Sequence, residues 1–254
     1  MAAVSKNLLE TIKELQGLQS LGKTYLGGGT SLAIRYNHRE SVDIDLFFSD
    51  IIGKDGFKTI EEEVNKYFGN RISNLHYPCE ENDQYIFLRF WVKANKVEIK
   101  VEIMQNINFL DPAEEISGVR LATVRDVGLM KMVTVSNRAS NKDVYDLDYL
   151  TEEVSLQVLL KELKEKQERF NSEEHRTIFD MDGKEASPVD DPLILLKYDT
   201  NVTISNDRPN HSSNRVQVEK GSKNLMEAKN SYRRKVRRLC NDLGIDFPSV
   251  TPIN

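Results

Sequence analysis

The segment from Leu26 to Phe48, LGGGTSLAIRYNHRESVDIDLFF, constrains the fold of this chain more than any other stretch. A short apolar run ends in three glycines, a helix pattern follows, and a strand pattern then carries two aspartates. In a β-strand, residues two apart share a face, so Asp43 and Asp45 project together with about 7 Å between their Cα atoms. The order of strand, glycine turn, helix and strand predicts a mixed α/β unit.

The glycine turn suits an anion. Glycine lets the backbone approach a phosphate, and the free N–H groups and dipole of the following helix favour negative charge there. The turn lacks the Gly-Lys-Ser/Thr of a Walker A loop and the third glycine of the dinucleotide fingerprint. We expect Gly28, Gly29 and Thr30 to hold phosphates, with Thr30 capping the helix. An ordinary strand-to-helix turn is the alternative.

The two aspartates suit a divalent cation, because neighbouring carboxylates repel each other unless a cation lies between them. A third ligand is expected from the strand at 96–105, where Glu98 and Glu102 share the polar face. We predict Asp43, Asp45 and Glu102 as ligands of two Mg²⁺ or Mn²⁺ ions roughly 4 Å apart, with Glu98 as the alternative third ligand. A solvent-exposed strand edge is the other reading. The apolar residues expected on the buried faces are Val42, Ile44, Leu46, Val97, Ile99, Val101 and Ile103.

Periodicity along the chain predicts strands first and helices later. The expected strands cover residues 23–26, 41–48, 82–92 and 96–105, and the expected helices cover 5–21, 31–38, 56–68, 123–137, 141–151, 156–170 and 222–243. After Pro112 the patterns are helical. We therefore predict an α+β protein with a mixed-sheet core at 1–112, and a mainly helical C-terminal domain at 113–254 with an irregular segment near 180–221.

Composition narrows the class of protein. The chain has 254 residues, of which 39% are hydrophobic and 30% charged. No apolar run reaches the roughly 18 residues of a membrane span, and the N-terminus lacks a signal-peptide layout, so a cytoplasmic protein without a membrane partner is expected. Cys79 and Cys240 lack metal-site spacing and are expected to be reduced thiols. The net charge of −5 argues against nonspecific polyanion binding by the whole surface.

A second charged cluster lies downstream. Thr123 and Asp126 have the T-x-x-D spacing of a helix start. Asp143 and Asp146 are three apart on the next predicted helix, so their like charges need a cation. A surface charge cluster is the alternative, and Lys131, beside an apolar stripe, suits either reading. The candidate cations are Lys131, Arg138 and Lys142.

Together these regions resemble the AbiEii/AbiGii-type nucleotidyltransferases, which include toxins of toxin–antitoxin and phage abortive-infection systems. The first motif is carried by Gly28-Gly29-Thr30, His38-Arg39-Glu40-Ser41 and Asp43-Ile44-Asp45-Leu46. The second is carried by Asp126, Lys131, Arg138 and Lys142-Asp143-Val144-Tyr145-Asp146-Leu147. The resemblance covers roughly residues 20–180, and nothing from about 190 onward matches it.

The resemblance implies a polymerase-β-like fold and Mg²⁺-dependent transfer of a nucleoside monophosphate from an NTP. The acceptor would be RNA, tRNA included, or a protein hydroxyl, and a cognate antitoxin would be a partner. The implied catalytic residues are Asp43, Asp45, Glu102, Lys131, Asp143 and Asp146. The implied nucleotide contacts are Gly28, Gly29, Thr30, Arg39, Ser41 and Lys131.

Two other functions and one basic segment complete the reading. A haloacid-dehalogenase-like phosphohydrolase also uses Asp-x-Asp, although Leu46 and Phe47 fit its motif poorly. A catalytically silent nucleotide-binding interaction protein is the other alternative. From Arg215 to Arg238 there are nine Lys/Arg and two Glu. This basic segment is expected to bind RNA phosphates or an acidic surface of the chain or of a partner.

Overall fold

The computed structural model describes residues 3–181, 185–199 and 215–248, and the chain forms two compact units. Unit 1 comprises Met1–Val127, Lys166–Lys184 and Gln217–Ser222, and unit 2 comprises Gly128–Glu165, Glu185–Val216 and Lys223–Asn254. Each unit therefore combines segments that are far apart in the sequence. The division into domains at 1–112 and 113–254 stays a prediction. Much of the irregular segment expected near 180–221 lies outside the described residues.

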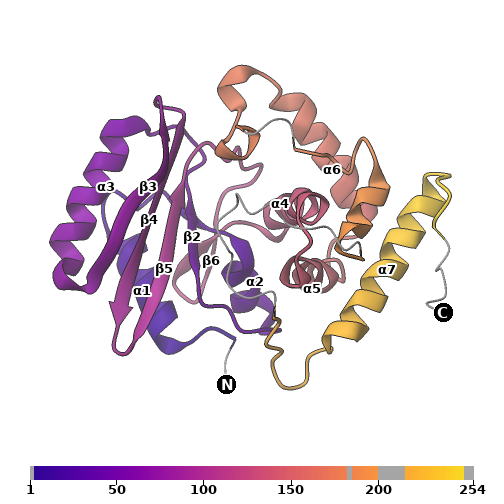
Figure 1. Cartoon of the computed structure of the whole chain (residues 1–254), viewed down its shortest axis with the longest axis horizontal. Helices are drawn as coiled ribbons and strands as arrows, with labels where there is room; N and C mark the ends of the chain where they lie inside the picture. The colour runs from indigo at the N-terminus through magenta and orange to yellow at the C-terminus, as the bar shows by residue number, and fades with distance from the viewer. Residues whose placement is uncertain (1–2, 182–184, 200–214, 249–254) are drawn as a thin grey trace. The chain divides into compact units, whose positions relative to one another are not determined.

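Unit 1 contains a seven-stranded mixed sheet in the order β3-β4-β5-β2-β1-β7-β6. Figure 1 labels strands β2 to β6 of this sheet. The strands are β1 (Tyr25–Leu26), β2 (Ile44–Phe47), β3 (Ile72–Glu81), β4 (Tyr85–Ala94), β5 (Val97–Met104), β6 (Glu114–Ile116) and β7 (Val119–Leu121). β2 runs parallel to β5 and β1 parallel to β7, whereas the other neighbouring pairs are antiparallel. The sheet and its helices confirm the predicted α+β class and mixed-sheet core.

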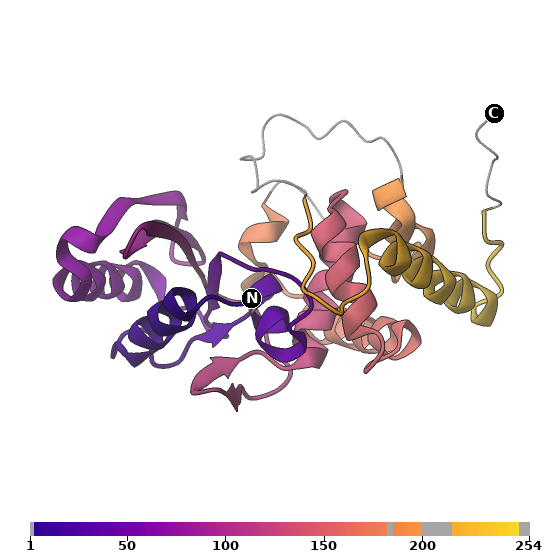
Figure 2. The ribbon, with the colours of Figure 1, turned by 90° about the horizontal axis from the view of Figure 1, so that it is seen from below.

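Helices α1 (Lys6–Gly17) and α3 (Gly53–Phe68) pack with the apolar face of this sheet, and Figure 2 shows the two helices as neighbours. Ser5 caps α1 by accepting a hydrogen bond from the Leu8 N–H. The shared core takes alternate strand residues, among them Ile44, Leu46, Leu88, Phe90, Val101 and Ile103. Since side chains alternate across a strand, the residues between these positions lie on the opposite face. That opposite face carries the candidate carboxylates.

Three strands were not predicted, and the reasons are local. β3 contains Asn74, with a φ of 52°, and Pro78, and both residue types are disfavoured inside strands. β6 and β7 have only three residues each. Ser117 and Gly118 join them with φ values of 56° and 74°, which is the conformation of a two-residue hairpin turn.

Two apolar positions and one cap were predicted wrongly. Val42 is 48% exposed and Val97 is 52% exposed, because Val42 precedes the paired part of β2 and Val97 lies at the hairpin end of β5. Helix α2 (Gly28–Tyr36) begins before Thr30, and its N-cap is Gly27. Thr30 therefore lies inside the first turn of the helix, where its side chain takes a different role.

The regular secondary structure among the described residues of unit 2 is helical. Helix α4 (Val124–Asn137) begins in unit 1 and continues into unit 2, which also holds α5 (Asn141–Leu150), most of α6 (Leu156–Arg169), a 3₁₀ segment (Pro192–Asp199) and α7 (Leu225–Asp242). A Cβ atom on Gly128 would lie 2.8 Å from Leu159 Cδ2 and 3.0 Å from Leu150 Cδ2, so glycine lets α4 pack closely there. Among the described helices of the chain, none has the length and apolarity of a membrane span.

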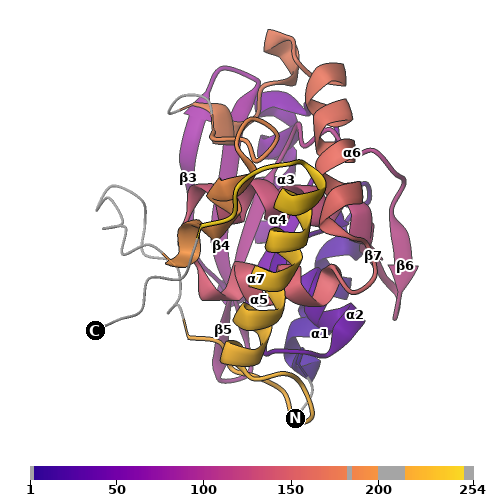
Figure 3. The same ribbon diagram turned by 90° about the vertical axis from the view of Figure 1, so that its right-hand side faces the viewer.

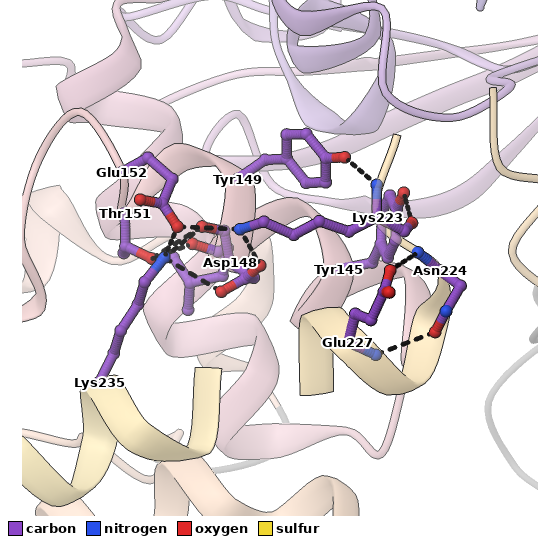
Figure 4. A network of polar contacts seen from close by, with 10 residues as sticks. Tyr145, Asp148, Tyr149, Thr151, Glu152, Lys223, Asn224, Glu227 and Lys235 are labelled. Atoms are coloured by element: carbon purple, nitrogen blue, oxygen red, sulfur yellow. Dashed lines mark hydrogen bonds and ion pairs between the residues drawn. The ribbon is translucent and has the colours of Figure 1, made fainter. Parts of the chain in front are cut away.

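The basic helix α7 lies alongside α5, as Figure 3 shows. Asp148 of α5 has a fully buried side chain, and it meets Lys223 Nζ at 2.9 Å and Lys235 Nζ at 3.0 Å. Both lysines also contact Glu152, at 2.9 Å and 2.7 Å, and the Tyr145 hydroxyl donates to the Lys223 carbonyl (Figure 4). Two of the nine basic residues expected to bind RNA or an acidic surface are thus held by α5 of the same unit.

Candidate functional site

Five charged side chains gather on the polar face of the sheet in unit 1, and we name them the sheet cluster: Asp43, Asp45, Arg89, Lys100 and Glu102. The strand register produces this grouping, because Asp45 of β2 lies opposite Glu102 of β5, and Glu102 lies opposite Arg89 of β4. Lys100 shares a face with Glu102, two residues away on the same strand. The expected neighbourhood of Asp43, Asp45 and Glu102 is therefore present.

The cations of the sheet cluster bind Glu102. Arg89 Nε and Nη2 lie 2.8 Å and 2.6 Å from Glu102 Oε1, and Lys100 Nζ lies 3.0 Å from Glu102 Oε2. Lys100 Nζ is also 3.9 Å from Asp43 Oδ2. Glu98, the alternative third carboxylate, pairs in register with Lys93 at the far end of β5. Glu102 is accordingly the glutamate beside the aspartates.

The charges of the sheet cluster shift one another's pKa values. Burial, followed by the negative charge of Glu102, raises the pKa of Asp45 to about 7. Burial also acts to raise the pKa of Glu102, but the ion pairs with Lys100 and Arg89 outweigh it and lower that pKa. For Lys100, burial opposes the charge, yet Glu102 and Asp43 raise its pKa. Near neutral pH the Asp45 carboxyl is therefore about half protonated in the metal-free protein, and a cation bound beside it would favour its charged form.

The glycine turn wraps around Asp45. The Gly27 N–H donates to the Asp45 carbonyl over 3.0 Å. Gly28 has a φ of 61°, and a Cβ atom at this position would collide with the Asp45 carboxylate. The first backbone N–H groups of a helix have no partner within the helix. The N-terminus of α2 thus lies directly at the candidate metal ligands, where an anion such as a phosphate is favoured.

Thr30 and Ser41 fix the backbone that carries Asp43. The buried Thr30 hydroxyl donates to the Asp43 carbonyl over 2.5 Å and lies 2.8 Å from Ser41 Oγ. Arg39 is also buried, and its Nη1 donates to the Glu40 carbonyl over 2.9 Å. Contact of these three side chains with a phosphate stays a prediction. In the structure, the Thr30 side chain fixes the backbone at the start of the Asp-x-Asp strand.

The donors of the sheet cluster suit a hard cation only in part. Carboxylate oxygens are the ligands that Mg²⁺ and Mn²⁺ prefer, and Asp43 and Asp45 supply them from one strand. Within the described residues, however, no three His, Cys, Asp or Glu side chains are grouped as a ready set of metal ligands. Glu102 stands beside the aspartates with its oxygens already paired to Arg89 and Lys100. The residues therefore fit a cation held by the two aspartates, and the role of Glu102 as a metal ligand stays a prediction.

A second group of charges lies in unit 2, and we name it the helix cluster: Lys131 of α4, Arg138 just after it, and Asp143 and Asp146 of α5. Lys131 Nζ lies 2.7 Å from both Asp143 Oδ1 and Asp146 Oδ2. Arg138 Nε donates to Asp143 Oδ2 over 2.7 Å. The expected pairing of the two aspartates with Lys131 and Arg138 is thus present.

Three of the four side chains of the helix cluster are closed to solvent, whereas the Arg138 side chain is 39% exposed. The side chains of Lys131, Asp143 and Asp146 are 8%, 1% and 0% exposed. Burial acts to raise the pKa of Asp143, but the charges of Lys131 and Arg138 outweigh it and hold that pKa well below its usual range. Lys131 was expected at the edge of an apolar stripe, and in the structure its side chain is more deeply buried than that position implies. The helix cluster keeps its charges by pairing them inside the unit.

The start of α4 was read correctly from its T-x-x-D spacing. The Asp126 N–H donates to Thr123 Oγ1 over 3.1 Å. Asp126 is fully buried, and its carboxylate accepts hydrogen bonds from the N–H groups of Leu110 and Asp111. Asp126 therefore fixes the loop before β6, to which Leu110 and Asp111 belong.

Sequence reasoning missed Arg89 and the Asp148 pairing with Lys223 and Lys235. The alternation of β4 places Arg89 on the polar face, but only the register with β5 puts it beside Glu102. Asp148 directly follows the second motif, and nothing in its local spacing indicates partners about eighty residues downstream. Both pairings depend on contacts between distant segments.

Known proteins resemble this chain in sequence and in fold. The sequence pattern of one family, described as the nucleotidyl transferase AbiEii toxin of type IV toxin–antitoxin systems, matches residues 16–224. A protein of Aquifex aeolicus (strain VF5) that is described as uncharacterized is 30% identical over 150 residues, which is 59% of this chain and 68% of that protein. The solved structure of MenT4, a nucleotidyltransferase toxin of Mycobacterium tuberculosis H37Rv, covers 96% of this chain and 94% of its own with a TM-score of 0.52 and 13% identity. At that identity the likeness to MenT4 concerns the fold.

Proposed function

Because the chain belongs to the AbiEii family of nucleotidyltransferase toxins, we propose that it transfers a nucleoside monophosphate from an NTP to a hydroxyl of an RNA, tRNA included, or of a protein. The observation that carries this proposal is the placement of the α2 N-terminus against Asp45 in the sheet cluster. The N-terminus of α2 favours a phosphate, and the aspartates of the sheet cluster favour a divalent cation. A nucleoside triphosphate with its metal ion combines both. A cognate antitoxin is the proposed protein partner.

The residues of unit 1 have distinct proposed roles. The backbone N–H groups of Gly28, Gly29 and Thr30 bind the β- and γ-phosphates at the start of α2. Asp43 and Asp45 would hold Mg²⁺ or Mn²⁺, and a bound divalent ion would supply positive charge next to the phosphates. Glu102, fixed beside Asp45 by its two cations, orients the acceptor hydroxyl. Arg39 and Ser41 are the further proposed nucleotide contacts. Both lie just before β2, where they also help to fix the backbone that leads to Asp43.

Lys131, Asp143 and Asp146 are the proposed functional residues of unit 2. The two aspartates hold the Lys131 ammonium group in one position, and the role of Lys131 in neutralising a triphosphate stays a prediction from the resemblance. In phosphoryl and nucleotidyl transfer the protein contributes mainly positioning and electrostatic stabilisation.

Nucleotide transfer tests the proposal. Purified protein is incubated with each labelled NTP, Mg²⁺ or Mn²⁺, and either total RNA or a protein extract, alongside the double variant Asp43→Ala/Asp45→Ala. We expect label on RNA or on protein with the wild type and none with the double variant. Asp50→Ala is the matched control, because Asp50 is an exposed aspartate just beyond β2.

The same experiment separates the alternatives. Phosphate release without label transfer would indicate a phosphohydrolase of the haloacid-dehalogenase kind. Nucleotide binding without reaction would indicate a silent interaction protein. Expression in a growing host is the second readout, and equal growth of cells with the wild type and with the double variant would contradict toxicity under those conditions.

A further inference from the structure

Lys100 occupies a position that a three-carboxylate metal site does not provide for. Its ammonium group lies 3.0 Å from Glu102 Oε2 and 3.9 Å from Asp43 Oδ2, so it stands between the two outer carboxylates of the sheet cluster. The Lys100 side chain is only 20% exposed, and the Glu102 side chain 9%. This lysine is thus built into the cluster as a fixed positive charge.

The strand pattern places Lys100 there. On β5, residues 98, 100 and 102 share the polar face, while Ile99, Val101 and Ile103 are buried in the core. The parallel register sets Glu102 opposite Asp45 and Val101 opposite Ile44. Lys100 therefore comes beside Asp43 for the same reason that Glu102 comes beside Asp45. A shift of Lys100 out of this place would require a new rotamer, since its backbone is fixed in the centre of the sheet.

The other cation of the sheet cluster acts in the same direction. Arg89 holds Glu102 Oε1 through two nitrogen atoms, and Lys100 holds Oε2. Paired in this way, Glu102 has little negative charge left to offer a metal ion. A divalent cation bridging Asp43 and Glu102 would also lie within a few ångströms of the Lys100 ammonium, where two positive charges repel strongly. Asp43 and Asp45 carry the charge that remains.

We propose that Lys100 is a positioning residue whose ammonium group takes the place of a second divalent cation, so that Asp43 and Asp45 hold a single divalent ion. The inference deepens the proposed function, on which its relevance to catalysis rests, by setting the number of ions at the site. Arg89 supports Lys100 by keeping Glu102 oriented toward it. The positive charge next to Asp43 then comes from the Lys100 ammonium group and does not depend on the concentration of metal ions.

Binding of Mn²⁺ to the full-length protein tests this inference, with calorimetry for stoichiometry and electron paramagnetic resonance for free ion. We expect one Mn²⁺ per chain in the wild type. In Lys100→Met, Glu102 and Asp43 lose their shared cation, and we expect either a second bound Mn²⁺ or at least a tenfold tighter first one. Lys100→Arg keeps the charge and should bind one ion as the wild type does. Lys93→Met is the matched control, because Lys93 is an exposed lysine on the neighbouring strand β4.

The outcomes separate this inference from the proposed function. Two ions in the wild type, no ion in either protein, or identical stoichiometry and affinity in wild type and Lys100→Met would overturn it. If Lys100→Met does not fold, as judged by circular dichroism, Lys100→Gln takes its place, and Arg89→Gln, which also frees Glu102, should tighten Mn²⁺ binding. A wild type that binds one Mn²⁺ but transfers no nucleotide would leave the ion count standing and reject only the transferase activity.

Discussion

The sheet cluster and the helix cluster contain similar side chains and differ in charge balance. The sheet cluster sets three carboxylates against two cations, and the Asp43 side chain is 28% exposed. The helix cluster sets two carboxylates against two cations, and its aspartates are at most 1% exposed. A balanced and closed cluster satisfies itself, whereas an open cluster with excess negative charge attracts a cation. The comparison assigns ligand binding to the first and positioning to the second.

The largest expected effect is on catalysis by the sheet cluster. Asp45→Asn removes a charge from the site while keeping the size of the side chain. We expect nucleotide transfer to fall at least ~10³-fold, which corresponds to about 4 kcal/mol in activation free energy. The measurement is the single-turnover rate of label transfer, with circular dichroism to confirm folding. If Asp45→Asn keeps an activity within tenfold of the wild type, nucleotide transfer does not depend on the sheet cluster, and the assignment of ligand binding to that cluster is wrong.

The next largest effect is on folding, and it belongs to the helix cluster. Lys131→Met leaves Asp143 and Asp146 buried without the cation that joins them. Removing one partner of a buried ion pair typically costs about 3–5 kcal/mol, and we expect about 3 kcal/mol because Arg138 still pairs with Asp143. Urea denaturation measures this loss of the free energy of unfolding.

Two further variants serve as controls for this prediction. Lys161→Met changes a lysine whose side chain is 78% exposed and should alter the free energy of unfolding very little. Lys131→Met/Asp146→Asn removes one of the two stranded charges and should recover part of the lost stability. If the double variant is no more stable than Lys131→Met, the cost comes from packing rather than from charge.

The third prediction uses the raised pKa of Asp45. Its pKa in the native state is about 7 and in the unfolded state about 3.8, so between these values the native state holds a proton that the unfolded state has lost. Stability of the metal-free protein should therefore fall as pH rises from about 4 to about 7, and Asp45 should add no further change above that. Asp45→Asn should remove this contribution. The full shift corresponds to about 4 kcal/mol, and because Asp45 is only half-buried and partly screened by solvent we expect the variant to gain about 1–2 kcal/mol at pH 8 relative to pH 4.

Thermal denaturation in EDTA across this pH range checks that prediction. The readout is the difference between wild type and Asp45→Asn, because the other titrating groups are common to both proteins. Asp50→Asn is the control and should follow the wild type. Asp143 should behave in the opposite way below this range, since its lowered pKa gives stability that is present above about pH 4 and is lost as the pH falls further. If the stability of Asp45→Asn and that of the wild type change with pH in parallel, the pKa of Asp45 is not raised, and the proposed electrostatic difference between the two clusters is wrong.

The fold could be predicted where local patterns decide it. The strand, glycine turn and helix around Asp43 and Asp45 follow from spacing, and so do α4 and α5, because periodicity and caps act over a few residues. β3 could not be predicted in this way, since Asn74 and Pro78, which are typical of turns, lie inside it. The location of the site was thus readable from one segment, although the complete sheet was not.

The partners within the site were harder to predict than its location. Glu102 was separable from Glu98 only by the register between β2 and β5. Arg89 became part of the site through the register between β4 and β5. Registers are set by turns and by packing of the whole sheet, so a single strand does not contain them. Charge balance, which distinguishes the two clusters, is therefore a property of the tertiary structure.

The smallest expected effect concerns Asp148, a third place where carboxylates meet lysines, and it tests whether charge balance alone explains the difference. Asp148 is buried like the aspartates of the helix cluster, but two lysines share it. Lys235→Met should therefore cost only about 1 kcal/mol of the free energy of unfolding, since Lys223 remains, while Lys223→Met/Lys235→Met should cost more than the two single variants combined. Arg238→Gln, an exposed change on the same helix, is the control. If Lys235→Met is as costly as Lys131→Met, a second cation does not protect a buried aspartate, and burial rather than charge balance separates the clusters.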